Sequence, residues 1–174
     1  MIETLIRSPH AILRALYGEE LELEAPPAWK FWAKRPPPMP SFPDTQAEEI
    51  DLDKAWHALH FWFSGGANEG RFPAAFLLYG GREVGSVDVG YGPARCLKST
   101  EVSHLETFLR QYTPDKLKSW YDPLRLMDAE TYPEFWDEAD REEMIEYLIQ
   151  NFEDLKGFVE KANTSNNGLI LWLN

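Results

Sequence analysis

A long helical periodicity between Asp137 and Ala162 constrains the fold more than any other feature of this sequence. Apolar side chains recur in it every three or four residues, the spacing that places them on one face of an α-helix. That face consists of Met144, Leu148, Phe152, Leu155, Val159 and Ala162. A stripe of this kind has to be buried, so we expect other elements to pack along it. The residues NTSNNG end the helix, and LILWLN after them predicts a closing strand.

A second buried helix is predicted around residues 52–63, and Gly65-Gly66 ends it. Its apolar stripe is rich in aromatic side chains and consists of Leu52, Ala55, Trp56, Leu59, Trp62 and Phe63. Three polar side chains, Asp53, His57 and His60, fall together on the flank of this stripe. They are therefore candidates either for a site or for internal hydrogen bonds at the edge of the core.

Prolines dominate residues 26–43 and exclude a regular helix or a central strand there. We expect a surface excursion that Trp29, Phe31 and Trp32 hold over the core. The alternative is a docking peptide in the polyproline II conformation, because the motif PPPMP follows Lys34 and Arg35.

The remaining segments give shorter elements. Ser8-Pro9 predicts the start of a helix that ends near Tyr17, and REVGSVDVGYGPARCL predicts a strand with a tight turn at residues 90–93. Further helices are expected at 100–112 and from Pro114 onward. Residues 120–136 are expected to be irregular, and the state of AAFLLYGG stays open.

Several of these blocks, in this order, resemble the YfbM-like family, a bacterial domain of unknown function. They are LDKAWHALHF, VGSVDVGYGPARCL, YDPLRLM, TYPEFW, YLIQNFEDLKGFVEKA and NGLILWL. The resemblance implies an α+β fold in which several helices pack on a small, mostly antiparallel sheet. The length of 174 residues agrees with a single domain over residues 1–174. The resemblance implies no activity and no cofactor, because the family brings no catalytic residues. Some domains of this kind are candidate immunity proteins beside toxins.

The net charge of −12 bears on partners and location. It repels nucleic-acid backbones and anionic membranes, and it suits a soluble protein or a basic protein partner. Cys96 is the only cysteine, so no intrachain disulfide can form. No run of 18 apolar residues and no convincing signal peptide occur, and we therefore expect a soluble cytoplasmic protein.

Asp53, His57 and His60 have a spacing at which helical side chains could reach one metal ion. A zinc site normally has three or four protein ligands, and no HExxH motif is present. The sequence therefore favours a structural role over a metal site. In that role Asp53 pairs with His57, and His60 is hydrogen-bonded at the margin of the core.

Asp88, Tyr91 and Arg95 surround the glycine-rich turn. A tyrosine and an arginine held there could bind an anionic ligand. The favoured interpretation is that Arg95 pairs with Asp88 and fixes the turn. The dinucleotide fingerprint is absent, and Cys96 with His104 is better explained as a structural thiol near an unrelated histidine than as a catalytic pair.

Acidic side chains line the helical face opposite the buried stripe of the long helix. They include Glu142, Glu146, Glu153 and Glu160. Two functions remain. The first is a non-catalytic binding protein, such as an immunity-like inhibitor of a basic toxin, that uses this acidic face. The second is an enzyme or a small-ligand-binding protein with a pocket around His57, His60, Tyr91 and Arg95. The sequence leans away from catalysis.

Overall fold

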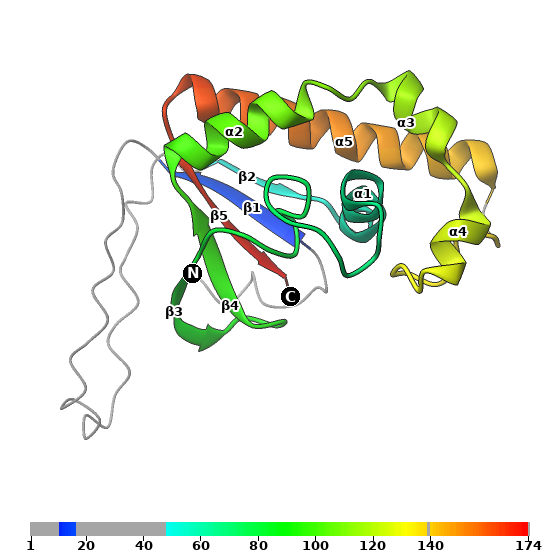
Figure 1. Ribbon diagram of the computed structural model, residues 1–174, viewed down its shortest axis with the longest axis horizontal. Helices are drawn as coiled ribbons and strands as arrows, with labels where there is room; N and C mark the ends of the chain where they lie inside the picture. Colours follow the sequence, from blue (N-terminus) through cyan, green and yellow to red (C-terminus); the bar gives the residue numbers. More distant parts are fainter. Residues whose placement is uncertain (1–10, 17–47, 139, 174) are drawn as a thin grey trace.

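An antiparallel sheet joins strands from both ends of the chain (Figure 1). This computed structural model describes residues 11–16, 48–138 and 140–173. Within these ranges, five strands pair in the order β2-β1-β5-β4-β3, and every pair is antiparallel. The strands are β1 (Ala11–Leu16), β2 (Glu48–Asp51), β3 (Arg82–Asp88), β4 (Pro93–Leu97) and β5 (Gly168–Leu173). The predicted closing strand is therefore the central strand of the sheet.

Helices cover the sheet and extend beyond it on one side (Figure 1). They are α1 (Ala55–Ser64), α2 (Ser99–Leu109), α3 (Pro114–Trp120), α4 (Pro123–Asp128) and α5 (Arg141–Thr164). The helix α5 contacts α1, α2 and α3 as well as β1, β2 and β5. The predicted α+β class, with helices packed on an antiparallel sheet, is confirmed.

The long helix α5 follows from local signals as well as from its buried stripe. The Asp140 side chain accepts hydrogen bonds from the backbone N–H groups of Glu142 and Glu143, so it caps the N-terminus. Glu142 and Glu143 in the first turn and Lys161 in the last turn match the helix dipole. The stripe that includes Leu148, Phe152 and Leu155 is buried as expected, and the helix runs from 141 to 164 instead of 137 to 162.

Aromatic packing joins α1 to α2 and α5. Phe63 of α1 lies against Phe76, Phe108, Tyr112 and Phe152, with ring centroids between 5.2 and 6.4 Å apart. Edge-on and tilted aromatic pairs add to the free energy gained by burying their area. The aromatic content of the 52–63 segment is thus explained by a core that three helices share.

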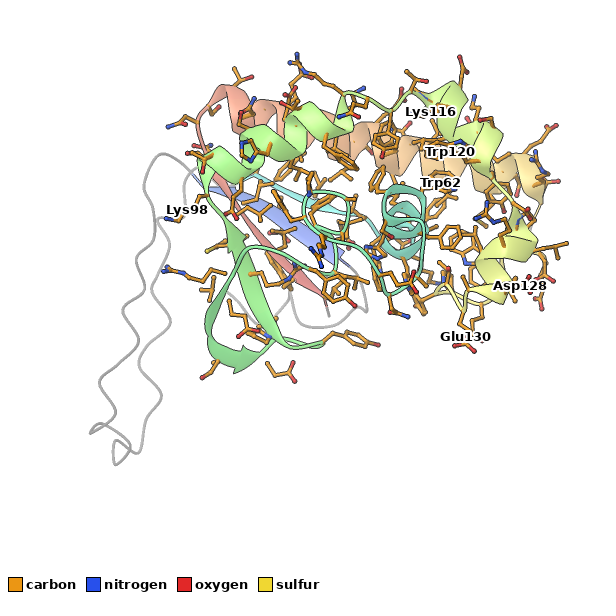
Figure 2. The ribbon with its side chains drawn as sticks, viewed as in Figure 1. Trp62, Lys98, Lys116, Trp120, Asp128 and Glu130 are labelled. Carbon is orange, nitrogen blue, oxygen red and sulfur yellow. The ribbon has the colours of Figure 1, made fainter. Side chains whose placement is uncertain are left out.

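The aromatic packing continues to the surface at α3. Figure 2 shows Lys116 and Trp120 at the end of the molecule opposite the β3-β4 hairpin. The Lys116 ammonium lies 4.9 Å from the centroid of the Tyr112 ring and 5.1 Å from that of Trp120. This contact shields part of an exposed indole with a cation.

Two expectations about secondary structure are wrong. Residues 11–16 form strand β1 and not a helix that ends near Tyr17, because this segment pairs with β2 on one side and β5 on the other. Pairing with distant strands outweighs the local Ser8-Pro9 signal. Residues 120–136 are not wholly irregular, since Asp122 caps the short helix α4 and Pro123 occupies its first turn.

The segment AAFLLYGG, left open by the sequence, is a series of turns that buries Phe76 and Leu77. The proline-rich segment 26–43 lies outside the described residues, and its predicted path stays a prediction. Among the helices that the structure describes, none is long and apolar enough to cross a membrane.

Candidate functional site

The helix α1 places the candidate histidines. It ends where Gly65 adopts φ 83°, a left-handed conformation that favours glycine, and the Gly65 N–H donates to the carbonyl of Phe61. The turns after Gly65 run back over the helix, so its polar flank faces other residues of the chain. His57 and His60 are both buried there, with 6% and 0% of their surface exposed.

His57 joins two segments that are far apart in the sequence. Its Nδ1 accepts a hydrogen bond from the backbone N–H of Tyr132 over 2.9 Å. Because Nδ1 is an acceptor, Nε2 carries the proton, and it donates to the carbonyl of Ala67 over 2.8 Å. The ring also stacks on Trp56 at a centroid distance of 4.6 Å. Burial lowers the pKa of His57, and the bond to Ala67 offsets part of that lowering.

His60 lies deeper, next to His57 and Tyr79, at ring-centroid distances of 6.3 and 6.2 Å. Neither of its ring nitrogens makes a hydrogen bond of ordinary geometry. Burial and, to a smaller extent, the nearby His57 lower the pKa of His60 to about 4, although the backbone of Glu69 counters part of the shift. The prediction that His60 lies at the margin of the core is therefore wrong, because its ring is fully buried.

Asp53 does not complete a site with these histidines. Both nitrogens of His57 have other partners, so the predicted Asp53–His57 pair does not form. Instead, Tyr147 of α5 donates its hydroxyl hydrogen to Asp53 Oδ2 over 3.0 Å and accepts from the backbone N–H of Lys54. Burial, and then this bond to Asp53, raise the pKa of Tyr147. In the described part of the chain, no three His, Cys, Asp or Glu side chains gather as metal ligands.

The side chain of Asp88 stabilises the glycine turn. Its Oδ1 accepts from the backbone N–H groups of Gly90 and Gly92 over 2.8 and 3.0 Å, and these two bonds lower the pKa of Asp88. Tyr91 is 75% exposed, while its backbone N–H donates to the carbonyl of Leu173 at the end of β5. The turn is therefore held without any ion pair to Arg95.

Arg95 fastens the segment that precedes β3. Its guanidinium donates to the backbone carbonyls of Phe76, Leu77 and Gly80 over 3.1, 2.7 and 2.9 Å. The predicted Asp88–Arg95 pair is wrong, because the Arg95 guanidinium donates to these three backbone carbonyls instead. Burial lowers the pKa of Arg95, and hydrogen bonds to neutral carbonyls do not reverse this.

The five candidate residues therefore do not gather around one point. His57 and His60 lie together on α1, whereas Asp88 and Tyr91 belong to the hairpin turn and Arg95 points to the turns before β3. Residues that the sequence did not indicate as site residues complete the histidine cluster, namely Trp56, Tyr79 and Tyr132. The stacked neighbours Trp56 and His57 were visible as a dipeptide, but the bond to Tyr132 spans 75 residues and left no local signal.

The acidic face of α5 is exposed as expected. Glu142, Glu146, Glu153 and Glu160 lie in one line along the helix, on the side opposite its buried stripe. The line covers about 27 Å at the rise of an α-helix. Arg110 of α2 approaches Glu160 at 3.9 Å, where both side chains are largely exposed, so this contact contributes little free energy.

The comparisons agree with this fold. The sequence model of the family described as "Domain of unknown function (DUF1877)" matches residues 11–172. The chain belongs to this family. It is also similar in fold to the crystal structure of a protein of unknown function, YfbM from Escherichia coli, with a TM-score of 0.64 and 16% identity over 95% of this chain and 99% of that one. The predicted YfbM-like membership is thus confirmed. No curated protein matches the sequence.

Proposed function

We propose that this protein is a non-catalytic binding module that recognises a basic protein through the outer face of α5, in the manner of an immunity protein that covers a toxin. The observation that carries the proposal is the line of exposed carboxylates on α5. We call Glu142, Glu146, Glu153 and Glu160 the acidic stripe.

Three properties of the acidic stripe support a role in recognition. A rigid helix fixes its carboxylates, and α5 is anchored by contacts with three other helices and with the sheet. Gln150 and Gly157 beside it are uncharged, and the ammonium group of the neighbouring Lys156 is hydrogen-bonded to the carbonyl of Tyr112. The chain as a whole carries a net charge of −12, so a basic partner is attracted from a distance. Charges arranged in this way accelerate association, and their effect falls with salt.

The alternative pocket has less support. Both ring nitrogens of His57 are hydrogen-bonded to backbone groups, and His60 is fully buried. Arg95 is occupied by three carbonyls, and Tyr91 projects from the hairpin turn. A small ligand that needed all four side chains would have to break these contacts first.

The test is affinity capture from the native lysate at 50 mM and 500 mM salt, concentrations that bracket strong and weak screening. Wild type is compared with a variant in which the four glutamates of the acidic stripe are replaced by glutamine. A control variant removes four charges from other exposed carboxylates: Glu83→Gln, Asp128→Asn, Glu134→Gln and Glu138→Gln.

We expect wild type and the control to retain a basic protein at low salt and to release it at high salt. The stripe variant should lose it at both. Equal retention by all three proteins, or the absence of a basic partner from the wild-type beads, would contradict the proposal.

A further inference from the structure

Two stretches of irregular backbone depend on His57. The residues 65–71 follow α1, and the stretch around Tyr132 follows α4. His57 is hydrogen-bonded to both, through the Ala67 carbonyl and the Tyr132 N–H. One side chain therefore ties two segments to the same helix face.

This tie requires a neutral imidazole. Nδ1 faces an N–H donor, and a proton on that nitrogen would place two N–H groups against each other. The bond to Tyr132 would be lost, whereas the bond from Nε2 to Ala67 would remain possible. Protonation of His57 therefore frees the Tyr132 side directly, and release of residues 65–71 depends on His60, which faces the backbone of Glu69.

His60 reinforces the requirement. It lies beside His57 with no exposed surface, and neither of its ring nitrogens makes a hydrogen bond of ordinary geometry. A charged imidazolium in that position would be neither hydrated nor paired. The titratable groups that face the two rings are each other, Tyr79 from the turns before β3 and Tyr132. Glu69 faces His60 through its backbone, and no described carboxylate raises the pKa of either ring.

We propose that His57 and His60 form an acid-sensitive latch, which holds residues 65–71 and Tyr132 on α1 at neutral pH and releases them on acidification. The latch is local. Arg95 keeps residues 76–80 fastened to β4 through three hydrogen bonds that do not titrate in this range. The contact between α2 and α5 contains neither histidine. The latch is independent of the proposed partner.

The pKa of His60 sets how strongly acidification shifts the balance between latched and released molecules. Its pKa is about 4 when enclosed and would return to the ordinary 6.5 when uncovered. Between pH 7.5 and pH 5 the ratio of released to latched molecules then rises about 30-fold from His60 alone. Carboxylates of ordinary pKa stay ionised over most of this interval, so the change reports mainly on histidine.

The experiment is amide hydrogen exchange by ¹⁵N NMR on the full chain at pH 7.5 and pH 5, with rates corrected for the intrinsic effect of pH. The Tyr132 amide and the amides of residues 65–71 should lose protection about 30-fold, while those of α2 and α5 keep it. Protection lost equally throughout, or unchanged at Tyr132, would overturn the latch.

Two variants separate the histidines from general acid effects. His60→Leu has a similar volume and gives up no hydrogen bond of ordinary geometry, so it should suppress most of the pH dependence. His104→Gln removes an exposed histidine of α2 and should leave the dependence as in wild type. The reverse pattern would contradict the proposal.

A measurement on wild type covers the case in which a variant fails to fold. The ¹⁵N shifts of His57 at pH 7.5 should show a protonated Nε2 and an unprotonated Nδ1. A charged ring or the opposite tautomer would sink the proposal.

Discussion

The helices α1 and α5 place their polar side chains in opposite ways. α1 turns two histidines inward, under residues that return over the helix, whereas α5 turns four glutamates outward along its exposed line. Both helices still contribute large aromatic side chains to one core, through Phe63 and Phe152. The comparison shows that residue type alone does not locate a site. His57, a residue type often found in active sites, here bonds two backbone segments, whereas the glutamates lie exposed on the surface of α5.

The largest expected loss of stability comes from the core packing between α1 and α5. Replacing the fully buried Phe152 by alanine leaves a cavity against Phe63 and should lower the free energy of unfolding by about 3–5 kcal/mol. Urea denaturation monitored by tryptophan fluorescence measures this loss. A loss below about 1 kcal/mol would mean that α1 and α5 are not packed through this contact.

A smaller loss of stability is expected from the buried His60 of α1 when the pH falls. The pKa of His60 is lowered to about 4, so its contribution to stability is complete above the unfolded value of 6.5 and is lost as the pH falls toward 4. Between pH 7.5 and pH 5, wild type should lose about 2 kcal/mol of stability from this group, and His60→Leu should lose much less. Denaturation curves at the two pH values give both numbers. Equal losses would mean that His60 is hydrated and not enclosed.

A third prediction addresses the bond that joins the two helices. Tyr147→Phe removes the hydroxyl group that binds Asp53 and the backbone of Lys54, and should cost about 1–2 kcal/mol. The aromatic ring remains, so the fold should be retained. Thermal denaturation checks the loss. An unchanged melting temperature would show that water replaces the hydroxyl without cost.

The smallest effect on stability is expected on the outward side of α5. The four exposed glutamates of the acidic stripe make few contacts, and their replacement by glutamine should change the free energy of unfolding by less than about 0.5 kcal/mol per site. Relief of mutual repulsion could even stabilise the helix slightly. A large loss in urea denaturation would assign these carboxylates a structural role and remove the contrast with α1.

Local patterns predicted the parts of this fold that depend on periodicity and capping. The stripe from Leu148 to Leu155 and the stop at Gly65 act within a few residues, and the sequence located α1 and α5 to within about four residues of their ends. The strand β1 was missed because its state depends on β2 and β5, which lie far along the chain.

For the candidate residues, the sequence predicted burial or exposure better than it predicted hydrogen-bond partners. The outward position of the α5 glutamates followed from helical geometry alone. The partners of Arg95 and His57 did not, because backbone carbonyls 15 to 19 residues away and an amide 75 residues away carry no side-chain signature. The spacing of Asp53 and His57 predicted that they pair, but Asp53 accepts a hydrogen bond from Tyr147 of α5 instead.

The most direct test of the account compares capture of the basic partner by wild type, by the variant lacking the four carboxylates of the acidic stripe, and by His60→Leu, all at pH 7.5 and low salt. The account predicts that His60→Leu retains the partner as wild type does and that the stripe variant loses it. Loss of the partner with His60→Leu while the stripe variant still retains it would show that recognition takes place at α1, and it would contradict the account.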